Sequence, residues 1–205
     1  MDKLNHGLIA GVDEAGRGPL AGPVVAAAVL LAPFYRNAEI RDSKKLSKAR
    51  REQVSRLIRE NAIAWSIGAA TGLEIDDQNI HRATLAAMRR AVLGLQCAPA
   101  FVIVDGRFYP ELPYPGSALV RADETESAVS AASILAKVFR DRYMGFLGQK
   151  YPEYGFCQNK GYPTAMHLRV LQSCGPCPDH RRSFRPVART NQACPAPRPN
   201  EPEQH

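Results

Sequence analysis

Residues 8–19 read LIAGVDEAGRGP, an apolar run followed by two adjacent carboxylates and a glycine-rich turn. The run up to Val12 predicts a β-strand, so Asp13 and Glu14 stand at its end. Paired acids repel each other and are rarely left at the edge of a core, so packing alone does not explain them. A divalent cation held between these carboxylates and a phosphate does explain them. The stretch therefore predicts both the first strand of a sheet and the edge at which its site lies.

The chain beyond this stretch alternates between strand and helix patterns. A hairpin is the simple interpretation of residues 8–31, because Gly22 and Pro23 separate two apolar runs. The short apolar run 101–104 ends at Asp105 and predicts a central strand. The predicted strands are residues 8–12, 24–31, 62–71, 101–104 and 118–120, and the predicted helices are residues 47–61, 76–95, 127–147 and 164–174. The pattern indicates an α/β fold, a mixed central sheet flanked by helices, with a C-terminal helical segment.

Composition bounds the class of protein. The chain has 205 residues, a size typical of one domain, which we assign to residues 1–187, and the proline-rich residues 188–205 predict a disordered tail. A net charge of +7 favours a polyanionic partner. Five irregularly spaced cysteines argue against a secreted disulfide scaffold. No apolar run is long enough for a membrane span, and the first residues do not form a signal peptide. We expect a cytoplasmic monomer with no membrane association.

Four acids stand where predicted strands end, namely Asp13, Glu14, Asp105 and Asp123. Taken alone, Asp105-Gly106 is more typical of a turn, and Asp123 can simply favour the start of the next helix, as Asp76 and Asp77 do. As a set they predict one crevice, because strand ends at one edge of an open α/β sheet converge there. Oxygen ligands select hard cations, so Mg²⁺ or Mn²⁺ is expected, in a two-metal site suited to phosphodiester hydrolysis.

Basic residues cluster in two stretches that can hold phosphates, residues 44–51 and 180–185. The alternative is a solvated helix face, which is the favoured interpretation for Lys48, Arg50 and Arg51. The charge of these stretches therefore supports a nucleic-acid partner without proving one.

Five motifs occur in an order that resembles the bacterial ribonuclease HII family. They are GVDEAGRG at 11–18, DSKKL at 42–46, VDG at 104–106, SAASILAKV at 130–138 and NKGYPT at 159–164. The resemblance covers about residues 8–187. It implies the ribonuclease H-like fold and an endonuclease that cuts the RNA strand of RNA–DNA hybrids. It also implies nicking on the 5′ side of single ribonucleotides in duplex DNA.

The same resemblance assigns roles to individual residues. The metal-binding catalytic acids are Asp13, Glu14, Asp105 and Asp123. The loop Gly16-Arg17-Gly18 matches the one that senses the 2′-hydroxyl, which distinguishes RNA from DNA. Tyr162 matches a tyrosine that stacks on the neighbouring sugar, although by itself it would be taken as a core residue, and Lys44 matches a phosphate contact.

Two positions depart from the family pattern, Arg121 where lysine is usual and Asn159 where histidine is common, and the second leaves the role of that position open.

Other interpretations are weaker but distinct. Cys174-Gly175-Pro176-Cys177 has the spacing of a redox motif, and with His180 and Cys194 it offers zinc ligands. Redox chemistry, however, needs that motif between a strand and a helix, whereas here it follows a predicted helix. A nucleic-acid-binding module without catalysis would explain the basic charge but not four convergent acids. A metal nuclease acting on DNA alone would not explain the glycine loop with Tyr162.

Overall fold

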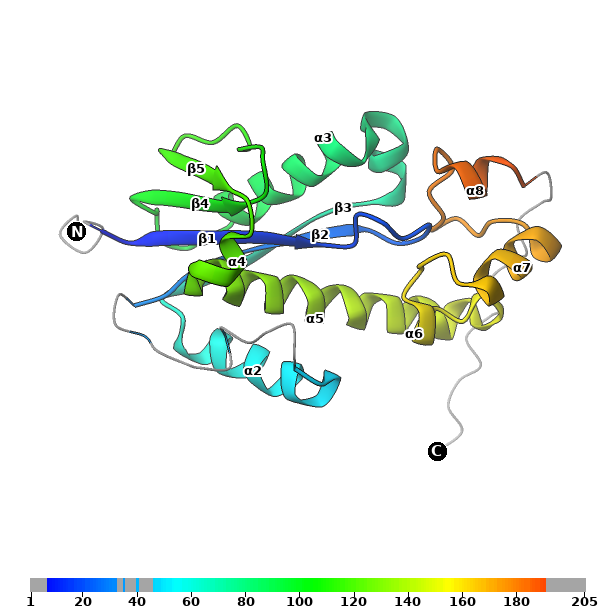
Figure 1. Cartoon of the computed structure of the whole chain (residues 1–205), viewed down its shortest axis with the longest axis horizontal. Helices are drawn as coiled ribbons and strands as arrows, with labels where there is room; N and C mark the ends of the chain where they lie inside the picture. The colour runs from blue at the N-terminus through cyan, green and yellow to red at the C-terminus, as the bar shows by residue number, and fades with distance from the viewer. Residues whose placement is uncertain (1–6, 33–34, 36–39, 41–45, 191–205) are drawn as a thin grey trace.

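The computed structural model describes residues 7–32, 35, 40 and 46–190, and its centre is a five-stranded sheet (Figure 1). The strands are β1 (Ile9–Ala15), β2 (Val24–Leu30), β3 (Ala64–Ala70), β4 (Phe101–Asp105) and β5 (Gly116–Leu119), in the order β3-β2-β1-β4-β5. The hairpin of β1 and β2 is confirmed as antiparallel, and β4 and β5 run parallel to β1. The sheet is therefore mixed, as predicted, with β1 in the middle.

Helices cover both faces of this sheet. The described part of the chain contains the helices α2 (Lys48–Asn61), α3 (Gly72–Leu93), α4 (Ala122–Thr125), α5 (Ser127–Lys150), α6 (Phe156–Asn159), α7 (Ala165–Cys174) and α8 (Arg185–Ala188), with the 3₁₀ turn η2 (Pro152–Tyr154). In Figure 1, α3 lies on one face, α5 and α2 lie on the other, and α6, α7 and α8 gather beyond one end of the sheet. The expected C-terminal helical segment is thus a separate cluster that α5 reaches with its last turns.

The alternation of side chains along β2 explains how the core is divided. Ala26 and Ala28 face the cluster that contains Met88 of α3, whereas Ala27 and Val29 face the cluster that contains Leu135 of α5. All seven residues of β2 are buried. A strand covered on both faces reads as a continuous apolar run, which is why the sequence shows no alternation here.

Helix α3 begins earlier than predicted, at Gly72 rather than at Asp76. Thr71 and Glu74 form a capping box, in which the Thr71 hydroxyl accepts from Glu74 N and the Glu74 carboxylate accepts from Thr71 N. The helix is interrupted at Asn79, whose φ of 71° is left-handed and whose side chain caps the next turn. Asp76 does not start the helix. Its carboxylate accepts hydrogen bonds from the backbone of Arg182 and Ser183.

The other boundaries lie close to the predicted ones. Ser47 and Thr164 cap α2 and α7 as expected, since each hydroxyl accepts from a first-turn backbone N–H. Helix α5 continues three residues past the predicted end, to Lys150. The predicted tail begins inside α8, which ends at Ala188, and residues 191–205 lie outside the described part of the chain. Within the described residues, no helix combines the length and apolar character that a membrane crossing requires.

The contact between β1 and α5 depends on one glycine. A Cβ atom on Gly11 would lie 2.1 Å from the backbone carbon of Ala128, far inside van der Waals contact. The first turn of α5 therefore rests directly on the backbone of β1, two residues before Asp13.

Gly11→Ala is expected to destabilise the fold by about 3 kcal/mol, because neither backbone can give way without shifting the core. Urea unfolding followed by circular dichroism measures this. Gly145→Ala is the matched control, since a Cβ there meets nothing within 4 Å, and alanine in a helix interior should stabilise by about 0.5–1 kcal/mol. Equal stability of Gly11→Ala and the parent would contradict the proposed contact.

Candidate active site

The topology brings the predicted acids to one edge of the sheet. The pairing of β1 with β4 ends at Val12 and Val104, so the next residues, Asp13 and Asp105, follow side by side where these parallel strands end. Strand β5 runs parallel to β4 and leads within three residues to α4, which carries Asp123. The carboxyl ends of parallel strands therefore supply all four acids from three neighbouring positions in the sheet.

Asp13 is the most deeply placed of these acids, with 6% of its surface exposed. Burial raises the pKa of Asp13 well above its ordinary value, and the charges of Glu14 and Asp105 raise it further. Hydrogen bonds from the Ser133 side chain and from Glu14 N, the latter 2.7 Å long, act in the opposite direction. The carboxylate is thus held by donors in an environment that disfavours its charge.

Glu14 is also perturbed. Burial raises the pKa of Glu14 and the charge of Asp105 adds to this, while Arg17 lowers it through an ion pair 3.4 Å long. The Arg17 side chain is about half exposed, so this pair is only a partial compensation.

Asp105 links β4 to the helix that carries the fourth acid. Its Oδ1 accepts a hydrogen bond from Ala122 N at 2.8 Å. Arg121 precedes this turn with a left-handed φ of 62°, an uncommon conformation for a residue with a side chain. Asp123 follows and is buried, with 8% exposed. The strained turn and the Asp105 hydrogen bond together fix the start of α4, and with it the position of Asp123.

The donor set fits a hard divalent cation. Asp13, Glu14 and Asp105 interact electrostatically, they offer only oxygen, and burial raises the pKa of both Asp13 and Glu14. In the described ranges, no three His, Cys, Asp or Glu side chains already form a closed metal-ligand group. The fit therefore rests on the donor chemistry and on an excess of buried negative charge, which a cation would relieve.

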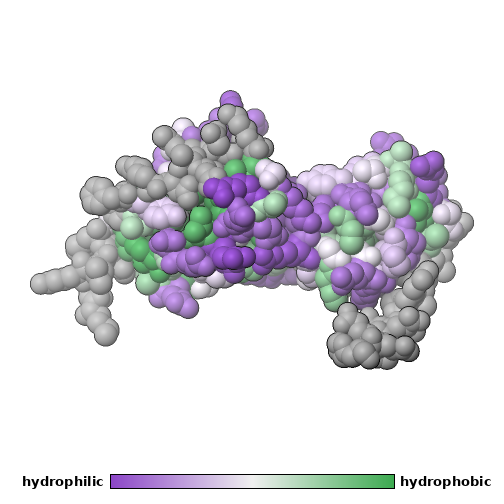
Figure 2. Space-filling view, turned by 90° about the horizontal axis from the view of Figure 1, so that it is seen from below, coloured by the Kyte–Doolittle hydropathy of each residue, from purple (hydrophilic) through white to green (hydrophobic). Residues whose placement is uncertain are grey.

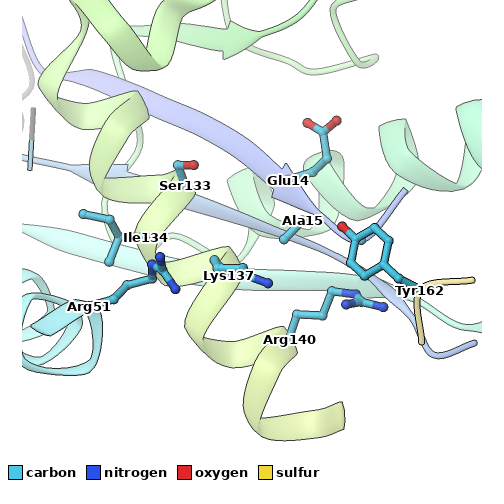
Figure 3. Close-up of a pocket in the computed structure, with 9 residues that line it drawn as sticks. Glu14, Ala15, Arg51, Ser133, Ile134, Lys137, Arg140 and Tyr162 are labelled. Atoms are coloured by element: carbon cyan, nitrogen blue, oxygen red, sulfur yellow. The ribbon is translucent and has the colours of Figure 1, made fainter. Parts of the chain in front are cut away.

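A pocket of about 300 Å³ adjoins the acids (Figure 3). It is lined by Glu14, Ala15, Gly16, Arg51, Ser133, Ile134, Lys137, Arg140 and Tyr162. Ser133, Lys137 and Arg140 stand at positions i, i+4 and i+7 of α5, so they share one helix face. The cationic side chains of Arg51, Lys137 and Arg140 therefore line the same pocket as Glu14. This arrangement is suited to a phosphate next to metal-binding acids.

Arg51 differs from its predicted place. It lines the pocket, and its guanidinium donates to Leu46 O at 2.9 Å. Lys48 and Arg50 are exposed, as expected of a solvated helix face. Figure 2 views the molecule from the side on which α2 lies, and hydrophilic side chains cover much of the middle of that face.

The glycine loop lies beside Tyr162. Gly16 has a φ of 97°, a conformation that favours glycine, and a Cβ there would collide with the Arg140 guanidinium at 1.9 Å. A Cβ on Gly18 would lie 3.6 Å from the Tyr162 ring. The ring is 43% exposed, and Arg140 lies 6.0 Å from its centroid. Tyr162 is therefore a pocket residue and not a packed core tyrosine.

Asn159 has a structural role in the turn before Tyr162. Its Nδ2 donates to Tyr154 O at 2.6 Å, and its Oδ1 accepts from Gly161 N at 2.7 Å. These bonds hold the left-handed residues Lys160 and Gly161 in place. Lys44, the predicted phosphate contact, lies outside the described residues.

The Cys174–Cys177 motif takes no part in this pocket. Cys177 is fully buried, and its Sγ lies 3.1 Å from His180 Nδ1. The motif follows α7, as predicted, and Cys194 lies outside the described residues.

Several residues of the site were not predicted from the sequence. Ser133 and Lys137 lie in the motif SAASILAKV, whose i, i+4 spacing was the available signal. The buried Arg181 donates hydrogen bonds to the carbonyls of Gly16 and Arg17 in the glycine loop, and Arg140 donates to the carbonyls of Ala21 and Pro23 further along the same connection. No local pattern marks either arginine, because their partners are distant in sequence.

Comparison with known proteins agrees with this geometry. The family model described as Ribonuclease HII matches residues 10–187. Ribonuclease HII of Acidovorax sp. (strain JS42) is 57% identical over 193 residues, covering 94% of this chain and 92% of that protein. Ribonuclease HII of Paracidovorax citrulli (strain AAC00-1) is 56% identical over 182 residues, covering 89% and 76%.

Solved structures show the same fold. The ribonuclease H2 of Pyrococcus horikoshii OT3 has a TM-score of 0.75 and 28% identity, over 88% of this chain and 95% of that one. A ribonuclease HIII solved with Mn²⁺ has a TM-score of 0.72 at 17% identity, over 91% of this chain and 70% of that one, and shows the fold alone. The chain therefore belongs to the ribonuclease HII family, metal-dependent endoribonucleases of the ribonuclease H type that act on RNA–DNA hybrids.

Proposed function

We propose that this protein cleaves the RNA strand of RNA–DNA hybrids and also nicks duplex DNA on the 5′ side of an embedded ribonucleotide. The products carry a 3′-hydroxyl and a 5′-phosphate. The observation that carries the proposal is the pocket in which Glu14 of the acid group, Gly16 of the glycine loop and Tyr162 meet. This shared pocket supports the proposal that cleavage and ribose recognition occur at one site.

Asp13, Glu14, Asp105 and Asp123 are the proposed ligands of Mg²⁺ or Mn²⁺. A pair of such ions, when bound, supplies activation of a water molecule and stabilisation of the leaving oxygen. The side chains of this chain prepare the site: Ser133 and the backbone of Glu14 donate to Asp13, and Ala122 N donates to Asp105. These donors fix the direction in which each carboxylate points before any ion binds.

The neighbouring groups position the substrate. Lys137 and Arg51 present positive charge to the pocket, where phosphates of the scissile strand are expected to lie. Lys44 is proposed as a further phosphate contact. The backbone of Gly16-Arg17-Gly18 is proposed to pair with the 2′-hydroxyl, and leaving that pairing unmade is what penalises DNA. Tyr162 is proposed to stack on the adjacent sugar.

Two alternatives are less well supported. A module that only binds nucleic acid does not account for buried acids whose charges raise each other's pKa. A nuclease for DNA alone does not account for a glycine loop that lies beside an exposed tyrosine, since a Cβ on Gly18 would be 3.6 Å from the Tyr162 ring. We therefore place ribonucleotide recognition and cleavage in the same pocket, and we propose that the protein acts as a monomer in the cytoplasm.

Asp13→Asn and Asp105→Asn are each expected to lower the nicking rate by about 10³-fold or more, because losing a ligand removes several kcal/mol of charge stabilisation. Duplex binding, measured by fluorescence anisotropy, should be unchanged or tighter, since a negative charge facing phosphate is neutralised. Glu60→Gln, an exposed acid of α2, is the control and should cut normally. Substantial nicking by both asparagine variants would show that the site is misplaced.

The metal can also be tested without substrate. Mn²⁺ or Mg²⁺ should raise the Tm of the parent, since ligands that bind only the native state stabilise it by about 2.7 kcal/mol at 100 times Kd. With chelator present, Asp13→Asn should melt above the parent, because burial and the charge of Glu14 disfavour the Asp13 carboxylate. Added metal should then raise the Tm of this variant much less. A Tm of the parent that ignores both ions would argue against the site.

Tyr162→Ala is expected to slow nicking of a duplex with one ribonucleotide about 5- to 150-fold, the equivalent of about 1–3 kcal/mol of stacking. Duplex affinity should change far less, because phosphate contacts supply most of it. Tyr162→Phe, which keeps the ring, is the matched control and should stay near the parent rate. An all-DNA duplex should remain uncut by every variant. If Tyr162→Ala cut as fast as the parent, the tyrosine would have no role in positioning substrate.

A further inference from the structure

The segment that follows α7 packs against the loop that connects β1 and β2. Gly22 N donates to Asp179 O and Arg181 N donates to Leu20 O, both at 2.8 Å, and Ala21 pairs with His180 in an isolated bridge. His180 and Arg181 are both fully buried, with 1% and 0% exposed. Two adjacent polar side chains are thus enclosed against the loop that carries Gly16, which lines the pocket.

Arg181 directs its whole guanidinium at one loop. Its Nη2 donates to Gly16 O at 2.6 Å, its Nη1 to Arg17 O at 2.9 Å and its Nε to Gly22 O at 3.0 Å. The rigid planar fork of arginine matches three carbonyls at once, which the single ammonium of lysine does not. Arg181 therefore fixes the backbone of the glycine loop from the side opposite the substrate.

His180 belongs to a hydrogen-bond chain whose protons can be assigned. Cys177 N donates to His180 Nδ1 at 3.0 Å, so the proton of neutral His180 is on Nε2. The Nε2 atoms of His180 and His167 are 3.0 Å apart, so His180 donates and His167 accepts. His167 then carries its proton on Nδ1, which donates to the carbonyl of Tyr162 at 2.9 Å. Every nitrogen is used, and the chain ends on the proposed stacking residue.

The surroundings keep this chain neutral. Burial lowers the pKa of His180 to about 3, and the neighbouring His167 contributes to this. Burial also lowers the pKa of His167. Each ring therefore stays neutral near pH 7, where a single set of tautomers satisfies all three hydrogen bonds.

We propose that His180 and Arg181 are a pair of positioning residues for ribonucleotide recognition, one holding Tyr162 through His167 and the other holding the glycine loop. The inference rests on the proposed function of that loop and of Tyr162. Its physical basis is that the two substrate contacts lie next to each other, while both are supported by neighbouring residues of one segment. A displacement of about 1 Å at a reacting site can cost about 10²-fold in rate, so such support affects catalysis without touching substrate.

A double-mutant cycle tests the Tyr162 arm. His180→Leu removes the donor to His167 and should slow nicking about 10- to 100-fold, with duplex affinity nearly unchanged. In the Tyr162→Ala background the same change should have an effect of less than about 3-fold, since the ring it positions is gone. His180→Gln, which retains an N–H donor, should restore part of the rate. Fully additive effects would mean that His180 only supports general folding, and would overturn this arm.

The glycine-loop arm has its own variant and control. Arg181→Lys should lower the nicking rate about 10-fold or more, because a lysine replaces three aligned donors poorly. Arg169→Lys, at an exposed arginine of α7 outside both basic stretches, should cut like the parent. Arg17→Ala cannot replace this variant, because Arg181 binds the backbone of Arg17 and not its side chain. If Arg181→Lys does not fold, the His180 double-mutant cycle decides the proposal.

Nuclear magnetic resonance tests the chain without catalysis. Long-range ¹H–¹⁵N spectra should show His180 protonated on Nε2 and His167 on Nδ1, and His180→Leu should shift the Tyr162 resonances. A charged imidazole, or the opposite tautomers, would overturn the proposal even if nicking occurs. If the parent showed these tautomers but did not nick a ribonucleotide-containing duplex, the proposed function would fail and the assignment of the buried chain would stand.

Discussion

Mutual repulsion among Asp13, Glu14 and Asp105 is the constraint on which the rest of the site depends. Burial and neighbouring negative charge both raise the pKa of Asp13, so the folded chain keeps these groups together at a cost. That cost is met by the sheet, because parallel β1 and β4 end side by side and leave the two strand-end acids no other place. It is also reduced by aimed donors, such as Ala122 N on Asp105. The arrangement is an anion-rich site, whose donor chemistry supports the proposed divalent cation.

Two buried arginines, in contrast, enclose positive charge near the glycine loop. Arg140 and Arg181 donate hydrogen bonds to backbone carbonyls, which for Arg140 are those of Ala21, Pro23 and Lys160. Burial lowers the pKa of Arg181 to about 9, and the nearby charge of Arg140 adds to this. Guanidinium groups tolerate such a place because their five N–H donors can all be directed at fixed acceptors. The two guanidinium groups also give hydrogen-bond donors to carbonyls of the β1–β2 connection that would otherwise be buried without a partner.

The C-terminal helical segment therefore contacts the glycine loop directly, through the hydrogen bonds of Arg181. Asp76 of α3 accepts from the backbone of Arg182 and Ser183, which ties the basic segment to the helix on the far face of the sheet. Cys177, which resembled half of a redox motif, contributes its backbone N–H to the buried histidine chain. Both residues have roles that follow from where the segment docks. A side-chain substitution at Cys177 keeps this backbone donor and changes only the contact of its Sγ with His180 Nδ1, which is 3.1 Å long.

The sequence alone determined those features that depend on local pattern. Apolar runs gave the strands, hydroxyl caps at Ser47 and Thr164 gave helix starts, and the order of short motifs identified the acids, the glycine loop and Tyr162. The strand and helix predictions are confirmed because backbone propensity acts over a few residues, whereas the roles of the site residues stay a prediction.

Only the tertiary structure decided which side chains support that chemistry. Arg181 and Gly16 are 165 residues apart, and no spacing in the sequence links them. The same holds for the placing of Arg51 in the pocket and for the contact of Asp76 with Ser183, 107 residues away. Such contacts arise when elements pack, and a buried arginine reads in sequence like any solvated one. Short stretches of sequence thus predict the fold and the acids, while the residues that hold the glycine loop and the pocket are determined by long-range packing.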